Sequence, residues 1–538
     1  MTSVKGTIID VVNRARFKGE VIVEAGKVKE VKPAEDVPDQ FIMPGFIDSH
    51  IHIESSMLVP SEFARLAVQQ GTVATVSDPH EIANVCGKEG IDFMIHNGKQ
   101  VPLKFHFGAP SCVPATPFET AGATLNVEDT AELLDRDDIF YLAEMMNWPG
   151  VLYDDPDVLA KIEAARSRNK PVDGHAPGLK GEQAAKYVSA GISTDHECFT
   201  KEEAIDKLNG GMKIAIREGS AAKNYSALSD LISEYPGEIM LCSDDKHPDD
   251  LIRGHINQLV ARSLKEGHDL FDVLEAACIV PIDHYNLNVG KLQPGDPADF
   301  VVLDDLDDMH INQTWIDGQQ VYGDQQVHFS RVDYTPINNF SPYKVSPAQF
   351  EIQSEKEEYP VIQAYDGELI TGKAYHRLPK ADQKLQPDTE NDLLKIAVVN
   401  RYQKEKPAVW FIRGFGLKTG AIASSVAHDS HNVIVIGTSD EHISNVVNLV
   451  MENHGGIAAV NNHQSEILPL SVAGIMTHQT GHDAAKGYEK LNNMAVEMGS
   501  ELHAPFMLIS FMALLVIPAL KMSDKGLFDG EKFEFINQ

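Results

Sequence analysis

The sequence predicts an α/β protein built around a (β/α)8 barrel. Eight short apolar runs that end in polar residues recur over roughly 240 residues, and helical stretches intervene between them, which is the size and rhythm of such a barrel. The runs occupy residues 46–52, 72–81, 103–109, 139–144, 171–175, 191–197, 212–219 and 239–245. Polar groups gather where the strands of a barrel end, at the face that carries the active site. A doubly wound open sheet gives the same local pattern and is the alternative.

The first 45 residues have the pattern of a small β-sheet. Residues 6–12 and 19–33 form short alternating runs with glycines between them, and a second β-rich segment follows the barrel at residues 290–304 and 311–322. We therefore predict one small β-domain from residues 1–45 and 289–340, which flanks the barrel of residues 46–288. Within the barrel, helices are expected over residues 61–70, 158–167, 182–190 and 201–208.

A further α/β domain is expected over residues 345–538. Residues 338–356 are polar, with two prolines, and are typical of a connection. Strands are predicted at residues 396–399, 409–412 and 433–437, and a helix at residues 441–453. The apolar stretch at residues 506–520 is shorter than the roughly 20 residues of a membrane-spanning helix and contains Pro518, so it predicts a buried helix or strand pair.

The charge balance excludes two classes of partner. Acidic residues number 79 and basic residues 46, so the formal net charge is −33. A chain of this charge is repelled by nucleic-acid phosphates and by anionic membranes. The five cysteines form no CxxC pair, and the first residues contain no apolar secretory signal. These features predict a soluble cytoplasmic protein without a disulfide framework.

Histidines and carboxylates at the predicted strand ends indicate a metal site. His50 and His52 are two residues apart, so in a strand both imidazoles point the same way. Later runs end in Glu144, in the histidines at 175 and 196, and in Asp244 or Asp245. Four imidazoles and two carboxylates suit a pair of divalent ions that share a bridging carboxylate. A lone HxH pair is a weak signal of a metal site. The signal becomes strong because four later strand ends also carry a histidine or a carboxylate.

The same residues carry a resemblance to a known family. The segments are MPGFIDSHIHIESSM at 43–57, DPHEIAN at 78–84, AEMM at 143–146, GHAP at 174–177, DHE at 195–197, SDDK at 243–246 and PGDPADFV at 294–301. Through them the chain resembles the amidohydrolase superfamily and, within it, the bacterial adenine deaminases. HxH with PGFID marks only the superfamily, whereas the serines after HIH, the DPHE segment and the carboxylate at 144 are more specific. The resemblance covers nearly the whole chain.

The resemblance implies a reaction and a set of ligands. Adenine would be hydrolysed to hypoxanthine and ammonia in a binuclear site, with manganese or iron favoured and zinc as a further candidate. His50, His52 and Asp244 would hold one ion, and His175 and His196 the other. Glu144 would bridge the two ions, in the place where many superfamily members carry a carboxylated lysine, and residues 139–147 contain no lysine. Asp244, preferred over Asp245 because it directly follows the apolar run and Ser243, would also move the proton of the attacking water.

Other polar residues near the predicted strand ends are candidates for further roles. His80 and Glu81 are predicted to position or protonate the purine, although a pair that stabilises the loop would have the same sequence. Glu54, Ser55 and Ser56 are predicted to bind substrate, with helix capping as the alternative for the serines. Arg217 is predicted to bind substrate or orient loops. His428 and His431 form an HxxH pair that is expected on the surface.

Two other functions fit parts of the pattern. A deacetylase of the same superfamily that acts on an N-acylated amino sugar can also use a glutamate at the fourth strand. A metal-stabilised binding protein without catalysis would bind metal and show no turnover. The predicted partner is a small purine base, with neither nucleic acid nor membrane involved, and the chain is expected to form a homo-oligomer.

Overall fold

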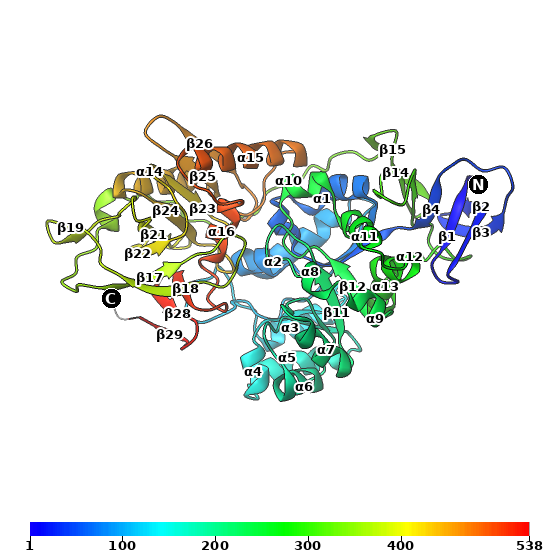
Figure 1. Cartoon of the computed structure of the whole chain (residues 1–538), viewed down its shortest axis with the longest axis horizontal. Coiled ribbons are helices and arrows are strands. Elements are labelled where there is room, and N and C mark those ends of the chain that lie inside the picture. The colour runs from blue at the N-terminus through cyan, green and yellow to red at the C-terminus, as the bar shows by residue number, and fades with distance from the viewer. Residues whose placement is uncertain (537–538) are drawn as a thin grey trace.

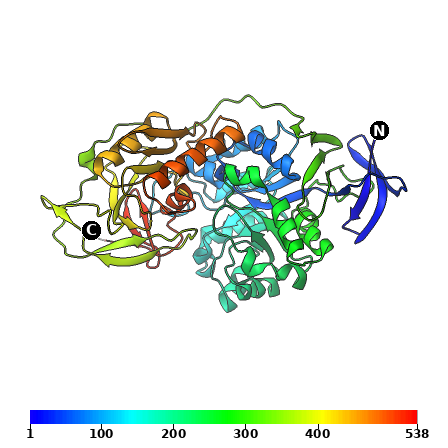
Figure 2. The same cartoon turned by 45° about the horizontal axis from the view of Figure 1, so that its top comes forward.

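The computed structural model describes residues 1–536. A β-sheet that contains the N-terminus lies at one end of the molecule, a ring of strands and helices lies in the middle, and a second large sheet lies at the other end (Figure 1). The view turned by 45° shows the same order of the three parts (Figure 2).

The sheet at the N-terminal end combines residues from two distant parts of the chain. Its strand order is β16-β15-β14-β13-β4-β1-β2-β3, and β13 pairs antiparallel with β4. Apolar residues alternate along its longest strands, so one face is buried and the other is exposed. The strands are β1 (Thr2–Asp10), β2 (Ala15–Glu24), β3 (Lys27–Pro33), β4 (Phe41–Pro44), β13 (Phe300–Leu303), β14 (Ile311–Ile316), β15 (Gln319–Gly323) and β16 (Gln326–Val327).

Eight parallel strands form the ring in the middle of the molecule. They are β5 (Phe46–Ile51), β6 (Thr72–Ser77), β7 (Lys104–Phe107), β8 (Leu142–Met145), β9 (Val172–Gly174), β10 (Thr194–Asp195), β11 (Lys213–Arg217) and β12 (Ile239–Cys242). The ring closes after β12, because Asp244 N–H donates to the His50 carbonyl at 2.9 Å and His52 N–H donates to the Asp244 carbonyl at 3.1 Å. This closure excludes the open sheet, and the fold is α/β and TIM-barrel-like.

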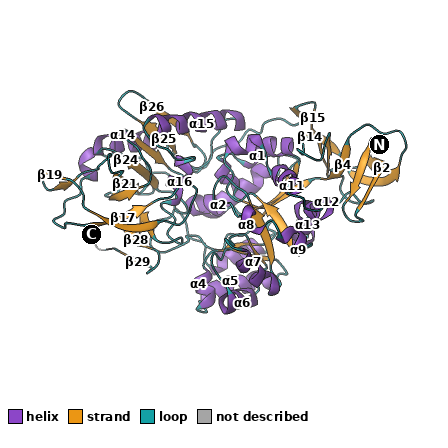
Figure 3. Cartoon of the chain, in the orientation of Figure 1, coloured by secondary structure: helices purple, strands orange, loops and turns teal. Residues whose placement is uncertain are grey.

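Helices surround the strands of the ring (Figure 3). They are α1 (Pro60–Ala67), α2 (His80–Gly98), α3 (Val127–Leu134), α4 (Trp148–Leu152), α5 (Pro156–Arg166), α6 (Gly181–Ser189), α7 (Lys201–Asn209), α8 (Tyr225–Leu228), α9 (Leu231–Glu234), α10 (Pro248–Arg253), α11 (Ile256–Lys265), α12 (Leu270–Leu274) and α13 (Val280–Tyr285). The four helices expected from the sequence coincide with α1, α5, α6 and α7 to within a few residues. Helix α5 begins at Pro156, because Asp155 accepts hydrogen bonds from two N–H groups of the first turn and proline is favoured at the first helical position.

The C-terminal part is a second eight-stranded sheet with helices packed on it. Its order is β18-β17-β22-β21-β24-β23-β25-β26, from β17 (Tyr359–Gln363), β18 (Gly372–His376), β21 (Leu394–Val399), β22 (Ala408–Arg413), β23 (Ala421–Ser424), β24 (Val433–Gly437), β25 (Gly456–Val460) and β26 (Ser465–Pro469). The remaining elements are β19 (Lys380–Ala381), β20 (Lys384–Leu385), α14 (Asp440–Glu452), α15 (Gly481–Glu497), α16 (Pro505–Phe511), β27 (Leu520–Ser523), β28 (Gly526–Asp529) and β29 (Glu534–Phe535).

The apolar stretch at residues 506–520 is a short buried helix followed by a turn. Helix α16 is buried along its whole length and lies on the side of the C-terminal sheet that faces the barrel (Figure 1). Among the described residues, no helix is both long enough and apolar enough to span a membrane.

The C-terminal part packs over the mouth of the barrel. Thr477 N–H donates to the Met57 carbonyl at 2.8 Å, and the Asn432 side chain donates to the Thr120 carbonyl at 2.9 Å. Met57 and Thr120 lie in segments that follow barrel strands. The carboxyl ends of those strands are therefore covered by residues that are hundreds of positions away in the sequence.

Candidate metal centre and active site

The six predicted metal ligands lie at the carboxyl ends of barrel strands. His50 and Glu144 are within β5 and β8, His52 follows β5, His175 and His196 follow β9 and β10, and Asp244 lies two residues after β12. All six side chains are buried. Parallel strands present their ends at one face of the barrel, so the fold brings these residues together.

Glu144 lies at the centre of the cluster. Its Oε2 is 2.9 Å from Nδ1 of His175 and 3.2 Å from Nε2 of His196. Its Oε1 is 3.6 Å from Nε2 of His52, and its Oε2 is 3.9 Å from Nε2 of His50. Burial alone would raise the pKa of Glu144, but the adjacent histidines, His175 foremost, hold it well below its usual value. The carboxylate is therefore an anion that faces four imidazoles.

The structure distinguishes Asp244 from Asp245. Oδ1 of Asp244 is 3.4 Å from Nε2 of His50 and 3.2 Å from Nε2 of His52. Burial opposes ionisation of Asp244, but the Arg217 guanidinium holds its pKa well below the usual value. Asp245 instead accepts a hydrogen bond from Ser55 at 2.5 Å, and burial together with the charge of Asp244 raises its pKa. Asp244 is thus the aspartate that belongs to the cluster.

The donor atoms of the cluster fit divalent cations. Nε2 of His50 and Nε2 of His52 are 3.3 Å apart, and among the described residues Nε2 of His175 and Nε2 of His196 are buried without a hydrogen-bond partner. Among the described residues, three sets of donor atoms that include the predicted ligands are close enough to share an ion: His50 with His196 and Asp244; Glu144 with His175 and His196; and His52 with Asp78, His80 and Glu144. Imidazole and carboxylate donors without thiolates suit manganese, iron or zinc. The third set brings His80, predicted from the sequence as a catalytic residue, within reach of the cluster.

Arg217 forms a buried ion-pair network at the edge of the cluster. Its Nη1 donates to Oδ2 of Asp244 at 2.5 Å and to Glu197, its Nη2 donates to Glu197 at 2.9 Å, and its Nε donates to the Ala222 carbonyl at 2.6 Å. Most of its N–H groups are thus engaged by the protein itself. The arrangement favours a role in holding Asp244 over the predicted contact with substrate. Sequence reasoning missed Glu197, although it lies in the DHE segment.

The structure gives each of the predicted substrate-binding residues Glu54, Ser55 and Ser56 a hydrogen-bond partner within the protein. All three belong to a buried 3-10 turn at Ile53–Ser56. Glu54 accepts a hydrogen bond from the Ile82 N–H at 3.1 Å, and Ser56 donates to the Ile53 carbonyl at 2.6 Å. Ser55 donates to Asp245. Burial raises the pKa of Glu54 to about 7.

His80 and Glu81 face the cluster from the start of α2. Nδ1 of His80 is 3.0 Å from Oδ2 of Asp78 and 3.5 Å from Oε1 of Glu144. The Glu81 carboxylate accepts hydrogen bonds from Nδ1 of His428 on one oxygen and from Nε2 of His431 on the other.

The expectation that the HxxH pair lies on the surface is wrong. His428 is 5% exposed and His431 is 1% exposed, because the loop between β23 and β24 enters the mouth of the barrel. The HxxH spacing of His428 and His431 was the one sequence feature that could have indicated a site here. Its partner Glu81 lies about 350 positions earlier, where no local pattern connects the two.

A small cavity lies beside the cluster, and we call it the metal chamber. Its lining combines cluster residues with Met146, Glu197, Arg217, Asp245, the His80–Glu81 pair and, from the C-terminal part, Leu369, His428, Asp429, Phe511 and Leu514. Five residues of this lining, Met146, Leu369, Asp429, Phe511 and Leu514, carry no signal of a site role in the sequence. Met146 follows barrel strand β8, whereas the other four close the chamber because the C-terminal part packs on the barrel.

Comparisons with known proteins identify the family of this chain. The model of the amidohydrolase family matches residues 41–321, and the model of the adenine deaminase C-terminal domain matches residues 368–534. An adenine deaminase from Salinibacter ruber is 52% identical over 538 residues, covering 100% of this chain and 98% of that protein. Adenine deaminases from Methanosarcina barkeri and a Sulfurovum species are 50% and 51% identical, and the alignments cover at least 99% of each chain. The chain therefore belongs to the amidohydrolase family and, within it, to the adenine deaminases.

Proposed function

We propose that this enzyme hydrolyses adenine to hypoxanthine and ammonia. The observation that carries the proposal is the buried cluster of four histidines and two carboxylates at the barrel mouth, closed by the C-terminal part. The full-length relatives are named adenine deaminases, which supports the same substrate. Deacetylation of an N-acylated amino sugar is therefore not favoured.

We assign two divalent ions to the cluster, manganese or iron first and zinc as a third candidate. His50, His52 and Asp244 would hold one ion, His175 and His196 the other, and Glu144 would lie between them. Bound there, the ions would supply a water molecule whose pKa is lowered toward neutrality. Glu144 is already anionic, so the site needs no carbon dioxide to create its bridge, unlike a carboxylated lysine.

Asp244 is the proposed proton carrier. Hydrolysis requires a base that accepts a proton from the attacking water and then delivers it toward the purine ring or the departing ammonia. Oδ2 of Asp244 is bound by Arg217, so Oδ1, which faces His50 and His52, is the oxygen available for that transfer. Arg217 and Glu197 hold the carboxylate in this orientation.

His80 and Glu81 are proposed to orient the purine. They line the metal chamber on a different strand end from Asp244, so the ring would lie between the two sides. His428 and His431 hold both oxygens of Glu81 and fix the direction of its lone pairs. A carboxylate held in this way can accept a hydrogen bond from a ring N–H or an amino group of the base.

The wider organisation is proposed on the same basis. We propose a small β-domain of residues 1–45 with 289–340, a catalytic barrel of residues 46–288 and a C-terminal α/β domain of residues 345–538. We further propose that the enzyme acts in the cytoplasm as a homo-oligomer on free purine base. The net charge of −33 supports the absence of nucleic-acid and anionic-membrane partners.

A substrate panel combined with metal analysis tests the proposal. Purified protein loaded with manganese, iron or zinc should release ammonia from adenine, should prefer adenine to adenosine, and should release no acetate from N-acetylglucosamine. Adenosine turnover equal to or above adenine turnover would reject the substrate assignment. Two bound ions with no turnover on any member of the panel would favour a binding protein.

A further inference from the structure

The metal chamber is too small for the proposed substrate as it stands. Its volume is about 30 Å³, which is room for a water molecule and not for a purine ring. Its apolar wall consists of Met146, Leu369, Phe511 and Leu514, all of them buried. A base must therefore enter by displacing part of this wall.

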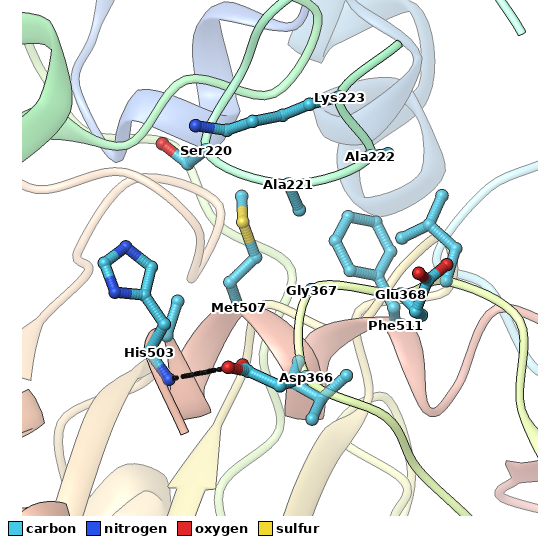
Figure 4. A pocket seen from close by; sticks show the side chains of 13 residues that line it. Ser220, Ala221, Ala222, Lys223, Asp366, Gly367, Glu368, His503, Met507 and Phe511 are labelled. Atoms are coloured by element: carbon cyan, nitrogen blue, oxygen red, sulfur yellow. Dashed lines mark hydrogen bonds between the residues drawn. The ribbon is translucent and has the colours of Figure 1, made fainter. Parts of the chain in front are cut away.

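A larger cavity lies directly outside that wall, and we call it the outer cavity. Its volume is about 280 Å³, close to the lower end of the range of small-molecule sites. It lies between the barrel loop at residues 220–223, the loop at residues 366–369 and helix α16 (Figure 4). Its rim carries the exposed charged residues Lys223, Asp366 and Glu368.

Leu369 and Phe511 line both cavities and form the partition between them. One side chain holds the backbone at both positions. The buried Nζ of Lys521 donates to the Leu369 carbonyl at 2.6 Å and to the Phe511 carbonyl at 2.9 Å. With both carbonyls tied to one ammonium group, rotation of the two side chains is the least costly way to open the partition.

The passage behind Phe511 leads to the residues that would orient the purine. The Phe511 ring stacks on the imidazole of His428, with centroids 4.6 Å apart and an interplanar angle of 11°. His428 in turn contacts Glu81. A flat ring that passes Phe511 therefore arrives beside the Glu81 carboxylate.

We propose that the outer cavity is a binding site where a neutral purine base is captured before it passes between Leu369 and Phe511 into the metal chamber. The proposal rests on the proposed function for the identity of the base. It extends the active site to residues of the C-terminal part that are not members of the metal cluster.

The chemistry of the outer cavity suits a neutral heteroaromatic ring. Met507 and Phe511 rise from α16 toward the loop that carries Ala221 (Figure 4). A thioether and an aromatic ring both make favourable contacts with the face of a flat ring. Asp366 and Glu368 at the rim can accept hydrogen bonds from N–H groups, whereas they repel the phosphate of a nucleotide, as does the net charge of the chain.

Two substitutions with matched controls test the proposal. Ala221→Trp fills the outer cavity, and Ala34→Trp makes the same change on the N-terminal β-sheet part. Leu369→Ala opens the partition, and Ile370→Ala truncates the next side chain, which is 42% exposed. Leu369→Val serves as the milder variant if Leu369→Ala does not fold.

Two readouts separate this proposal from the proposed function. The first is kcat/KM for adenine, which should fall at least tenfold in Ala221→Trp with metal content unchanged. The second is the rate at which phenanthroline, a planar heteroaromatic chelator that is neutral at the pH of the assay, removes metal from the loaded protein. That rate should fall in Ala221→Trp and rise in Leu369→Ala relative to their controls.

The outcomes are distinct. If Ala221→Trp matches Ala34→Trp in both readouts, the outer cavity is not the route and the proposal is overturned. If the chelator rates follow the expected order while the wild-type protein does not deaminate adenine, the proposed function fails and the route to the metal chamber stands.

Discussion

Substitution of Glu144 by glutamine is the most direct test of the metal centre. The change preserves the shape of the side chain and removes one negative charge at 2.9–3.9 Å from ring nitrogens of His50, His52, His175 and His196. Glu144 is the one carboxylate that faces all four histidines in these contacts. We therefore expect folded Glu144→Gln protein to lose at least one of the two proposed ions.

The size of the effect follows from Coulomb's law. Two divalent ions about 3.5 Å apart repel by roughly 19 kcal/mol at an effective dielectric constant of about 20. A carboxylate charge about 2 Å from each ion contributes roughly 17 kcal/mol of attraction per ion, which exceeds the repulsion in total. A neutral amide supplies no net charge to offset the repulsion. Turnover should fall at least about a thousandfold, which corresponds to roughly 4 kcal/mol in activation free energy.

Elemental analysis of the folded protein is the assay, with Glu203→Gln as the matched control. Glu203 is a buried glutamate of the same barrel whose Oε2 accepts hydrogen bonds from the N–H groups of Gly178 and Phe199. Its substitution should cost about 1–3 kcal/mol of stability and leave the metal content unchanged. Full occupancy of both ions in Glu144→Gln would refute the bridging role. Activity of the wild-type protein should also be independent of added bicarbonate.

Three further predictions concern other residues. Asp244→Asn should retain most of the metal and lower turnover about 10²–10⁴-fold, with a milder effect of Asp245→Asn in the same steady-state assay; a more damaging Asp245→Asn would show that the proton carrier is the other aspartate. Glu81→Gln and His431→Gln should each raise KM or lower kcat for adenine with unchanged metal content, because the first removes the Glu81 carboxylate and the second removes one of the two hydrogen bonds that fix its direction; loss of metal from either variant would make these residues supports of the cluster instead. Burial lowers the pKa of Lys521 to about 7, whereas a lysine in the unfolded chain titrates near 10.4. Between these two pH values the unfolded chain binds more protons than the folded protein. The free energy of unfolding therefore rises as the pH rises through this range. In denaturant titrations, wild-type stability relative to Lys521→Met should therefore increase by about 2 kcal/mol from pH 7 to pH 9; a pH-independent difference would contradict this.

Much of the barrel was predictable because its signals are local. A parallel strand buried on both faces has to be a continuous apolar run, and such runs are visible in the sequence. The i and i+2 spacing of His50 and His52 also decides locally that both rings face the same side of β5. The histidines and carboxylates at the strand ends are likewise visible in the sequence, one strand at a time.

The chamber around the ligands was not predictable in the same way. The 3-10 turn after β5 sends Ser56 back to its own backbone, and nothing in the ESS tripeptide distinguishes that direction from one toward the substrate. The HxxH pair has the polar sequence of a surface loop, yet His431 is buried against Glu81. The partition residues Leu369 and Phe511 look like ordinary core residues, because their role depends on which cavities lie on either side.

The sequence by itself thus determined which chemical groups stand at the end of each barrel strand, because strand periodicity and residue type are properties of a few neighbouring positions. Tertiary structure alone decided that β12 closes on β5, which brings Asp244 to His50 and His52. It also decided that His428, more than 340 residues beyond Glu81 in the sequence, forms a hydrogen bond with the Glu81 carboxylate. The physical reason is that such contacts arise when whole sheets and helices pack together. The packing energy is distributed over many side chains, so no single segment carries a periodic sequence pattern that would predict the contact.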